Sequence, residues 1–277
     1  MPDKLKFEHP EVYFHVGLGK VASKYLQHSV FPHFKGIRYI PTTRFDKCML
    51  EIKKGRHASY LVSREFDNQF TREVTKFAEV FPDAHPILLL RRHDDWIASQ
   101  YRRSAKNGFT APFHEFINLE KNTGKFTRES LDFSGKIELL EKLYGHKPLV
   151  LIYDDLLKDR LDFLEKIANY CNATFDREKI PFRARHTSYS EKQIRFMQWV
   201  NRYVRLRNPD YSKTGIIKFF QRIPIMIFRY TILYTALLIP SGWLDQGPLI
   251  PPEQLEKIRE ATRNDWDRCL RYTGKTL

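Results

Sequence analysis

Short apolar runs alternate with longer segments of helical periodicity along the first two thirds of the chain. Apolar runs bounded by polar residues are typical of strands that are buried on both faces of a sheet. The pattern predicts five strands, at 12–16, 37–40, 60–63, 86–90 and 149–153. Helical spacing of apolar residues follows four of them, over 20–34, 66–80, 94–106 and 156–170. Because strands alternating with helices form βαβ units, we predict a three-layer α/β/α fold with a mostly parallel sheet.

The alternation ends after Cys171, and only helical patterns follow. They cover 191–204, 216–239 and 253–272, the last after two consecutive prolines. We therefore predict a single domain over 1–277. Its α/β core would cover about 10–175, and a helical, basic and amphipathic extension would cover about 185–277.

The composition is that of a globular protein. Of the 277 residues, 42% are hydrophobic and 14% aromatic, which excludes a mainly disordered or low-complexity protein. The three cysteines, Cys48, Cys171 and Cys269, are widely spaced, so we expect no disulfide framework, no zinc site and a reducing, cytoplasmic location. The N-terminus has no apolar signal segment. The longest unbroken apolar stretch, 230–239, is shorter than the roughly 20 residues that a spanning helix needs.

The charge is strongly positive, with 47 Lys and Arg against 33 Asp and Glu and a net charge of +14. Ten basic and two acidic residues lie between 183 and 222, so more than half of the excess is there. Such a charge fits nucleic acid, a membrane surface, an acidic polymer or an anionic cofactor. Within 213–244, basic residues accompany aromatic ones, which fits a helix in a membrane interface and also a buried helical pair over an active site.

The loop after the first strand has the composition of an anion cradle. In a parallel sheet, ligands bind outside the carboxyl ends of the strands, which is where this loop lies. It contains two glycines that let the backbone approach a ligand, and three donors on the next turn: Gly17, Gly19, Lys20, Ser23 and Lys24. The lysine comes too early for the G-x-x-x-x-G-K-[ST] loop of nucleoside triphosphatases.

A second loop carries cations at the end of the strand at 86–90. Arg91 and Arg92 follow this strand, and Ser99 lies about two turns into the next helix. A guanidinium group binds two phosphate oxygens at once, so this loop suits a second anionic group. Two anion sites imply a ligand with two anionic ends.

Together the two loops resemble those of the 3′-phosphoadenosine-5′-phosphosulfate (PAPS) dependent sulfotransferases. The first loop is similar to the family's 5′-phosphosulfate loop at His15, Gly17, Lys20, Leu26 and Gln27. Departures occur where Ala22 replaces a glycine and where Ser23 and Lys24 replace two threonines. The second loop resembles the family's 3′-phosphate motif in Arg91 and Ser99, with His93 where proline is usual. Residues 149–157 and 185–190 resemble the strand that ends in an acidic pair and the late loop that closes over the nucleotide.

The resemblance implies a P-loop-like fold, a cofactor and a reaction. PAPS would be the cofactor and 3′,5′-adenosine bisphosphate the product, with no metal ion. The cofactor-binding residues would be Gly17, Gly19, Lys20, Ala22, Ser23, Lys24, Tyr25, Arg91, Ser99, Arg183 and Arg185. The reaction would be in-line transfer of a sulfuryl group to a hydroxyl of a carbohydrate, a glycolipid or another small acceptor. As in phosphoryl transfer, Lys20 would neutralise the leaving oxygen.

A general base must also take the proton of the acceptor hydroxyl. We select Glu65, because it follows the strand at 60–63 and so lies at the sheet edge that faces the ligand. A carboxylate in the first turn of a helix, stabilised by the helix dipole, explains Glu65 equally well. Asp46 and His33 are the reserve candidates.

Two other function classes remain as alternatives. A P-loop-type nucleotide kinase would need a Walker lysine, which this sequence lacks. A polyanion or nucleic-acid binding module would explain the charge but not Lys20 and Arg91 at strand ends. We therefore expect an anionic nucleotide and a hydroxyl acceptor as partners, an anionic membrane surface as a further one, and no nucleic acid.

Overall fold

The computed structural model describes residues 6–181, 189–204, 215–243 and 247–275. The chain divides into two compact units. The first contains 1–96, 128–185 and 261–277, and the second contains 97–127 and 186–260. Residues 97–127 of the predicted core therefore belong to the second unit, and the C-terminal residues 261–277 belong to the first.

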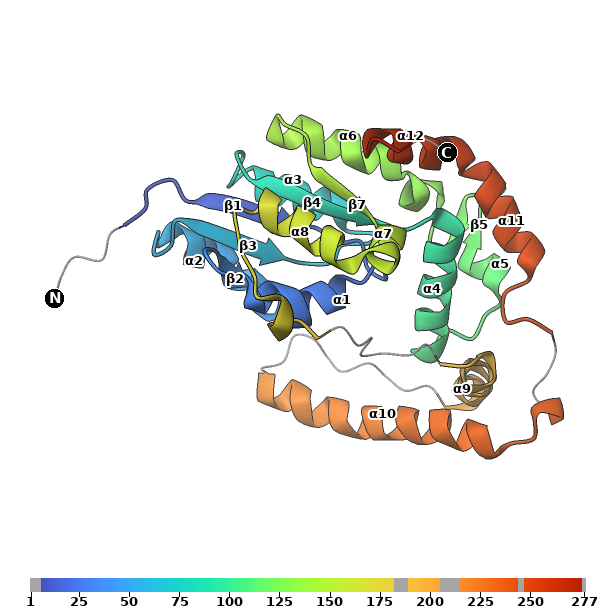
Figure 1. The fold of residues 1–277 in the computed structure, drawn as a ribbon. Helices are drawn as coiled ribbons and strands as arrows, with labels where there is room; N and C mark the ends of the chain where they lie inside the picture. The colour runs from blue at the N-terminus through green and yellow to red at the C-terminus, as the bar shows by residue number, and fades with distance from the viewer. Residues whose placement is uncertain (1–5, 182–188, 205–214, 244–246, 276–277) are drawn as a thin grey trace. The chain divides into compact units, whose positions relative to one another are not determined.

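The five predicted strands form one parallel sheet in the first unit (Figure 1). The strands are β1 (Glu11–His15), β2 (Arg38–Ile40), β3 (Ser59–Ser63), β4 (His85–Leu90) and β7 (Leu149–Ile152). Their order across the sheet is β2-β3-β1-β4-β7, so the first strand is central. Each bound lies within one residue of its prediction, because the apolar runs are short and are bounded by polar residues. The predicted three-layer α/β fold is confirmed.

Helices follow the strands of the first unit, but several are divided. They are α1 (Ser23–Tyr25), η1 (Leu26–Val30), η2 (Phe31–His33), η3 (Thr42–Lys47), α2 (Cys48–Lys53), α3 (Phe70–Ala78), η4 (Arg128–Leu131), α6 (Phe133–Tyr144), α7 (Tyr153–Lys158), α8 (Arg160–Tyr170), η5 (Arg177–Lys179) and α12 (Arg263–Tyr272). The helix predicted over 156–170 is interrupted at Asp159, whose carboxylate accepts a hydrogen bond of 3.0 Å from the Asp162 N–H. Asp159 thus ends α7 and caps α8.

Alternating side chains of β1 face two different helical layers. The Tyr13 ring lies 5.9 Å from the Tyr170 ring of α8, and the His15 ring lies 5.4 Å from the Phe31 ring of η2. On the other face, the Phe14 ring stacks 3.9 Å from the Phe77 ring of α3. The central strand is therefore buried on both sides, which is why its sequence is nearly continuous in apolar residues.

The second unit is mainly helical. The helix α4 (His93–Lys106) runs into it from the first unit, and the others are α5 (Phe113–Phe116), α9 (Glu191–Tyr203), α10 (Gly215–Thr235), η6 (Ala236–Leu238), η7 (Ser241–Trp243) and α11 (Pro252–Ala261), with a short hairpin of β5 (Ile117–Asn118) and β6 (Thr123–Gly124). A capping box of Ser190 and Gln193 begins α9. No helix within the described ranges has the length and apolar content needed to cross a bilayer.

One carboxylate connects three segments of the first unit. Asp265 of α12 accepts hydrogen bonds from His93 Nε2 (2.8 Å) and from the N–H groups of Phe133 and Ser134, both at 3.1 Å. The Ser134 hydroxyl donates a further bond of 2.6 Å. Burial by itself raises the pKa of Asp265, but the hydrogen bonds from His93 and Ser134 outweigh it and lower the pKa to about 2. His93 therefore has a structural use at a position where the resembling family has proline.

We expect Asp265→Ala to lower the free energy of unfolding by about 3 kcal/mol, because it leaves two N–H groups and a buried imidazole without an acceptor. Urea unfolding at pH 7 measures this change. The depressed pKa stabilises the fold above the ordinary pKa of an aspartate, and this contribution is lost as the pH falls toward about 2.

Asp267→Ala is the matched control on the same helix, and it should change the free energy of unfolding by less than about 0.5 kcal/mol. Equal effects of the two substitutions would contradict a special role for Asp265.

Candidate functional site

The first loop lies between the ends of β3 and β4 and is bonded to both. The Val16 N–H donates to Ile87 O (3.0 Å) and the Leu89 N–H donates to Gly17 O (2.8 Å). On the other side, the Phe66 N–H donates to Val16 O at 3.2 Å. The loop therefore continues the sheet beyond β1, at the carboxyl ends of the strands, where the sequence predicted it.

Gly17 allows this close packing. Its φ is +104°, and a Cβ at this position would lie 3.1 Å from Phe66 N and 3.2 Å from Glu65 Cα. A side chain would need both a strained backbone and a shift of the neighbouring chain. Gly17 thus brings the first loop against the segment that carries Glu65.

Gly19 has both backbone groups bonded within the protein. Its N–H donates to Asp67 Oδ1 at 3.0 Å, and its carbonyl accepts a bond of 2.8 Å from Trp96 Nε1. These two hydrogen bonds thus fix the position of Gly19 in the first loop. Sequence reasoning missed Asp67 and Trp96, because they lie 48 and 77 residues from Gly19 and no local spacing connects them.

Two non-glycine residues of the first loop adopt the left-handed conformation. Lys20 has φ 69° and Ala22 has φ 67°, so the helix predicted from residue 20 begins only at Ser23. The buried Ser23 hydroxyl donates to Leu18 O at 2.8 Å, so its proton is used inside the loop. Lys20 and Lys24 are exposed. Strained backbone at such a turn is common where a loop is shaped for a ligand.

His15, which belongs to the resembling motif, is a buried structural group. Its Nδ1 lies 2.7 Å from Ser63 Oγ, and Gln27 Nε2 donates to the same hydroxyl at 3.0 Å. Burial lowers the pKa of His15 to about 3, so its ring is neutral at pH 7. His15, Ser63 and Gln27 therefore connect β1, β3 and η1, and the positive charge of the site comes from lysine and arginine.

The paired arginines after β4 have different environments. Arg92 donates to both carboxylate oxygens of Asp94, at 2.7 and 3.1 Å, and this pairing raises the pKa of Arg92. The half-buried Arg91 places its guanidinium 4.8 Å above the Tyr153 ring. Its buried Nε has no hydrogen-bond partner among the described residues. Arg91 therefore has a donor to offer to a ligand, whereas Arg92 is held by Asp94.

The remaining predicted cofactor-binding residues lie in separate parts of the chain. Tyr25 is half-buried beneath the Arg160 guanidinium, which lies 5.7 Å from its ring centre, and burial raises the pKa of its hydroxyl. Ser99 lies on α4 in the second unit, whereas Arg91 lies in the first. Arg183 and Arg185 lie outside the described residues.

The three candidates for the general base lie in different environments. Glu65 is half-buried immediately after β3 and adjoins Gly17. Asp46 is exposed on η3, and His33 is half-buried at the end of η2. Of the three, Glu65 therefore lies against the first loop. In the part of the chain that the structure describes, no three His, Cys, Asp or Glu side chains gather closely enough to hold a metal ion.

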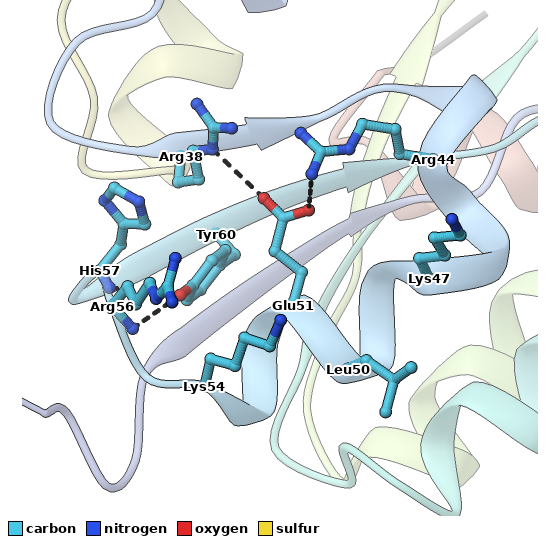
Figure 2. A pocket seen from close by; sticks show the side chains of 9 residues that line it. All are labelled: Arg38, Arg44, Lys47, Leu50, Glu51, Lys54, Arg56, His57 and Tyr60. Carbon is cyan, nitrogen blue, oxygen red and sulfur yellow. Dashed lines mark hydrogen bonds and ion pairs between the residues drawn. The ribbon is translucent and has the colours of Figure 1, made fainter.

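A basic pocket of about 290 Å³ lies along the edge strand β2 (Figure 2). Five of its lining side chains are cationic: Arg38, Arg44, Lys47, Lys54 and Arg56. Figure 2 shows the single carboxylate, Glu51, between Arg38 and Arg44, which pair with it at 3.4 and 2.8 Å. None of the predicted cofactor residues that the structure describes lines this pocket. It is an additional anion-attracting surface that sequence reasoning did not identify, because its cations come from β2, from η3 and from the connection between α2 and β3.

We expect Ala22→Gly to raise the free energy of unfolding by about 0.5–1 kcal/mol, because glycine adopts the left-handed conformation without steric cost. Chemical denaturation measures the change. The matched control is Ala168→Gly inside α8, which should lower stability by about 1 kcal/mol. Loss of stability in both variants would contradict the left-handed conformation of residue 22.

Comparisons with known proteins find similarity among solved structures and not among sequences. No protein-family model matches the chain, and no curated protein sequence matches it. A solved structure described as the "Crystal Structure of Sulfotransferase from Alicyclobacillus acidocaldarius" is similar to this chain with a TM-score of 0.48 and 14% sequence identity. The match covers 67% of this chain and 88% of that one.

Proposed function

We propose that this protein is a PAPS-dependent sulfotransferase that transfers a sulfuryl group to a hydroxyl of a carbohydrate, a glycolipid or another small acceptor. The observation that carries the proposal is the pair of cationic loops on neighbouring strands. Lys20 follows β1, Arg91 follows β4, and the two strands are joined as far as Gly17 and Leu89. The unbonded Nε of Arg91 supports a second anionic group there.

PAPS, when bound, supplies the sulfuryl group and a leaving phosphate. Lys20 and Lys24 are exposed cations at the end of β1, and they would stabilise the negative charge that builds on the leaving oxygen. Arg91 would hold the 3′-phosphate and so orient the nucleotide. The chain's own cations therefore supply the electrostatic stabilisation that the proposed reaction needs without a metal ion.

Glu65 is the proposed general base. It follows β3, which is the neighbour of β1, and it adjoins the first loop through Gly17. A carboxylate in this position would accept the proton of the acceptor hydroxyl as the oxygen attacks the sulfur atom.

Polyanion binding is a second candidate function, favoured by the basic pocket along β2. This pocket has five cationic side chains and one carboxylate. Binding of an anionic polymer there would depend on Arg44 and not on Arg91. The two functions therefore predict that different substitutions abolish ligand binding.

We expect 3′,5′-adenosine bisphosphate to stabilise the protein against heat, and Arg91→Ala to weaken its binding about 10- to 100-fold by removing a charged hydrogen-bond donor. Thermal shift at ligand concentrations about 100 times the dissociation constant, where stabilisation is about 2.7 kcal/mol, measures both effects. ATP with Mg²⁺ and an oligonucleotide are the comparison ligands.

Arg177→Ala is the matched control, since Arg177 is exposed and pairs with Glu165 on the surface. Stabilisation by ATP with Mg²⁺ but not by the bisphosphate would support the kinase alternative. Stabilisation by the oligonucleotide alone, abolished by Arg44→Ala, would support the polyanion alternative.

We expect Glu65→Gln to reduce turnover about 100-fold or more while leaving PAPS affinity unchanged, because the amide cannot accept the proton. The acceptor is first identified in a screen with labelled PAPS, and turnover and PAPS binding are then measured on the same preparation. Full activity of the variant would remove Glu65 as the base.

A further inference from the structure

The helix α10 and the turn η6 present a row of large apolar side chains to solvent. The row follows the spacing of one helix face, with Phe220, Ile227, Tyr230, Tyr234 and Leu237 exposed by 67, 60, 44, 59 and 54%. Leu238 and Trp243, further along the chain, are exposed by 85 and 81%. Single exposed apolar residues are ordinary, but a contiguous row of this kind marks an interaction surface.

The opposite face of α10 is already covered. Ile232 and Leu233 are buried, and they pack with Met197 of α9 in one apolar cluster. At 100° per residue, these side chains and the buried Ala236 lie on the side of the helix opposite to the exposed row. The helix is therefore apolar on two sides, and α9 covers only one of them.

The charge of the segment that contains α10 favours an anionic partner. From residue 211 to residue 243 the sequence contains four basic residues and no acidic one: Lys213, Lys218, Arg222 and Arg229. Two copies of this chain joined at this face would bring together two segments that both have a net positive charge. A surface of anionic lipids supplies the opposite charge.

The residue types also fit a bilayer interface. Tyr230, Tyr234 and Trp243 have rings that are apolar with a polar edge, and such rings concentrate where lipid meets water. Pro224 and Arg229 lie within α10, and Arg229 donates to the Asn107 carbonyl at 3.3 Å. This hydrogen bond joins α10 to the residue that follows α4.

We propose that the exposed face of α10, continued by η6 and η7, binds the surface of a membrane that contains anionic lipids. The face would bury its apolar side chains at the level of the lipid headgroups, and the net positive charge of the segment would attract it to the anionic lipids. This proposal rests on the second unit alone and does not depend on the proposed sulfotransferase activity.

Flotation with lipid vesicles tests the proposal on the full chain, without any nucleotide. We expect binding to vesicles of phosphatidylcholine with phosphatidylserine, and weak binding to phosphatidylcholine alone. Raising NaCl from about 0.1 to about 0.5 M should reduce the binding several-fold. The double variant Ile227→Ser and Tyr234→Ser should bind about 100-fold more weakly, because two apolar side chains no longer enter the interface.

Leu157→Ser is the matched control, since Leu157 is 64% exposed on α7, in the first unit. It should float like the unchanged protein, and unchanged melting temperatures should show that all variants fold. The proposal is overturned if the unchanged protein does not float, or if the double variant floats equally well. A dimer in analytical ultracentrifugation that the double variant dissociates, without vesicle binding, would instead assign the face to a second copy.

Discussion

The candidate site depends on one backbone arrangement, the continuation of β1 past its own end. Backbone groups of residues 16–18 bond to the neighbours of β1 on both sides, so the start of the first loop is hydrogen-bonded like a strand of the sheet. This is possible because Gly17 lacks a Cβ and adopts a positive φ. The chain must then leave the sheet abruptly, and it does so through two left-handed residues before α1 begins. Lys20 owes its exposed position at the sheet edge to this constraint.

The distribution of satisfied and unsatisfied polar groups separates supporting residues from candidate ligand-binding ones. Arg92, Gly19 and the Ser23 hydroxyl have their hydrogen bonds within the protein. The buried Arg91 Nε is without a partner among the described residues. A buried donor without an acceptor destabilises the protein, and a bound anion would remove this cost by accepting its hydrogen bond. Adjacent arginines with the same chemistry thus have different uses, which is a property of their neighbours rather than of the residue type.

The basic residues of the chain form separate groups with different physical roles. A few cations follow the strand ends, five more line the pocket along β2, and others accompany the apolar helix α10. In the pocket, Glu51 neutralises part of the charge and brings Arg38 and Arg44 together. On α10, no carboxylate within 211–243 does the same. The net charge of +14 is therefore the sum of separate surfaces and does not by itself indicate a single partner.

The amino-acid sequence by itself determined the strands, the α/β class and the cationic loops after β1 and β4. These follow from local patterns, since an apolar run buried on both faces and a loop at its carboxyl end are read from neighbouring positions. Only the tertiary structure decided that Arg91 and not Arg92 has a donor to offer, that Asp67 and Trp96 hold Gly19, and that Asp265 bonds His93. The partners in these contacts lie from two to 172 residues apart, and which donor meets which acceptor depends on how the elements pack. Packing among the described residues also decided which face of α10 lies against α9, because its sequence is apolar on both faces.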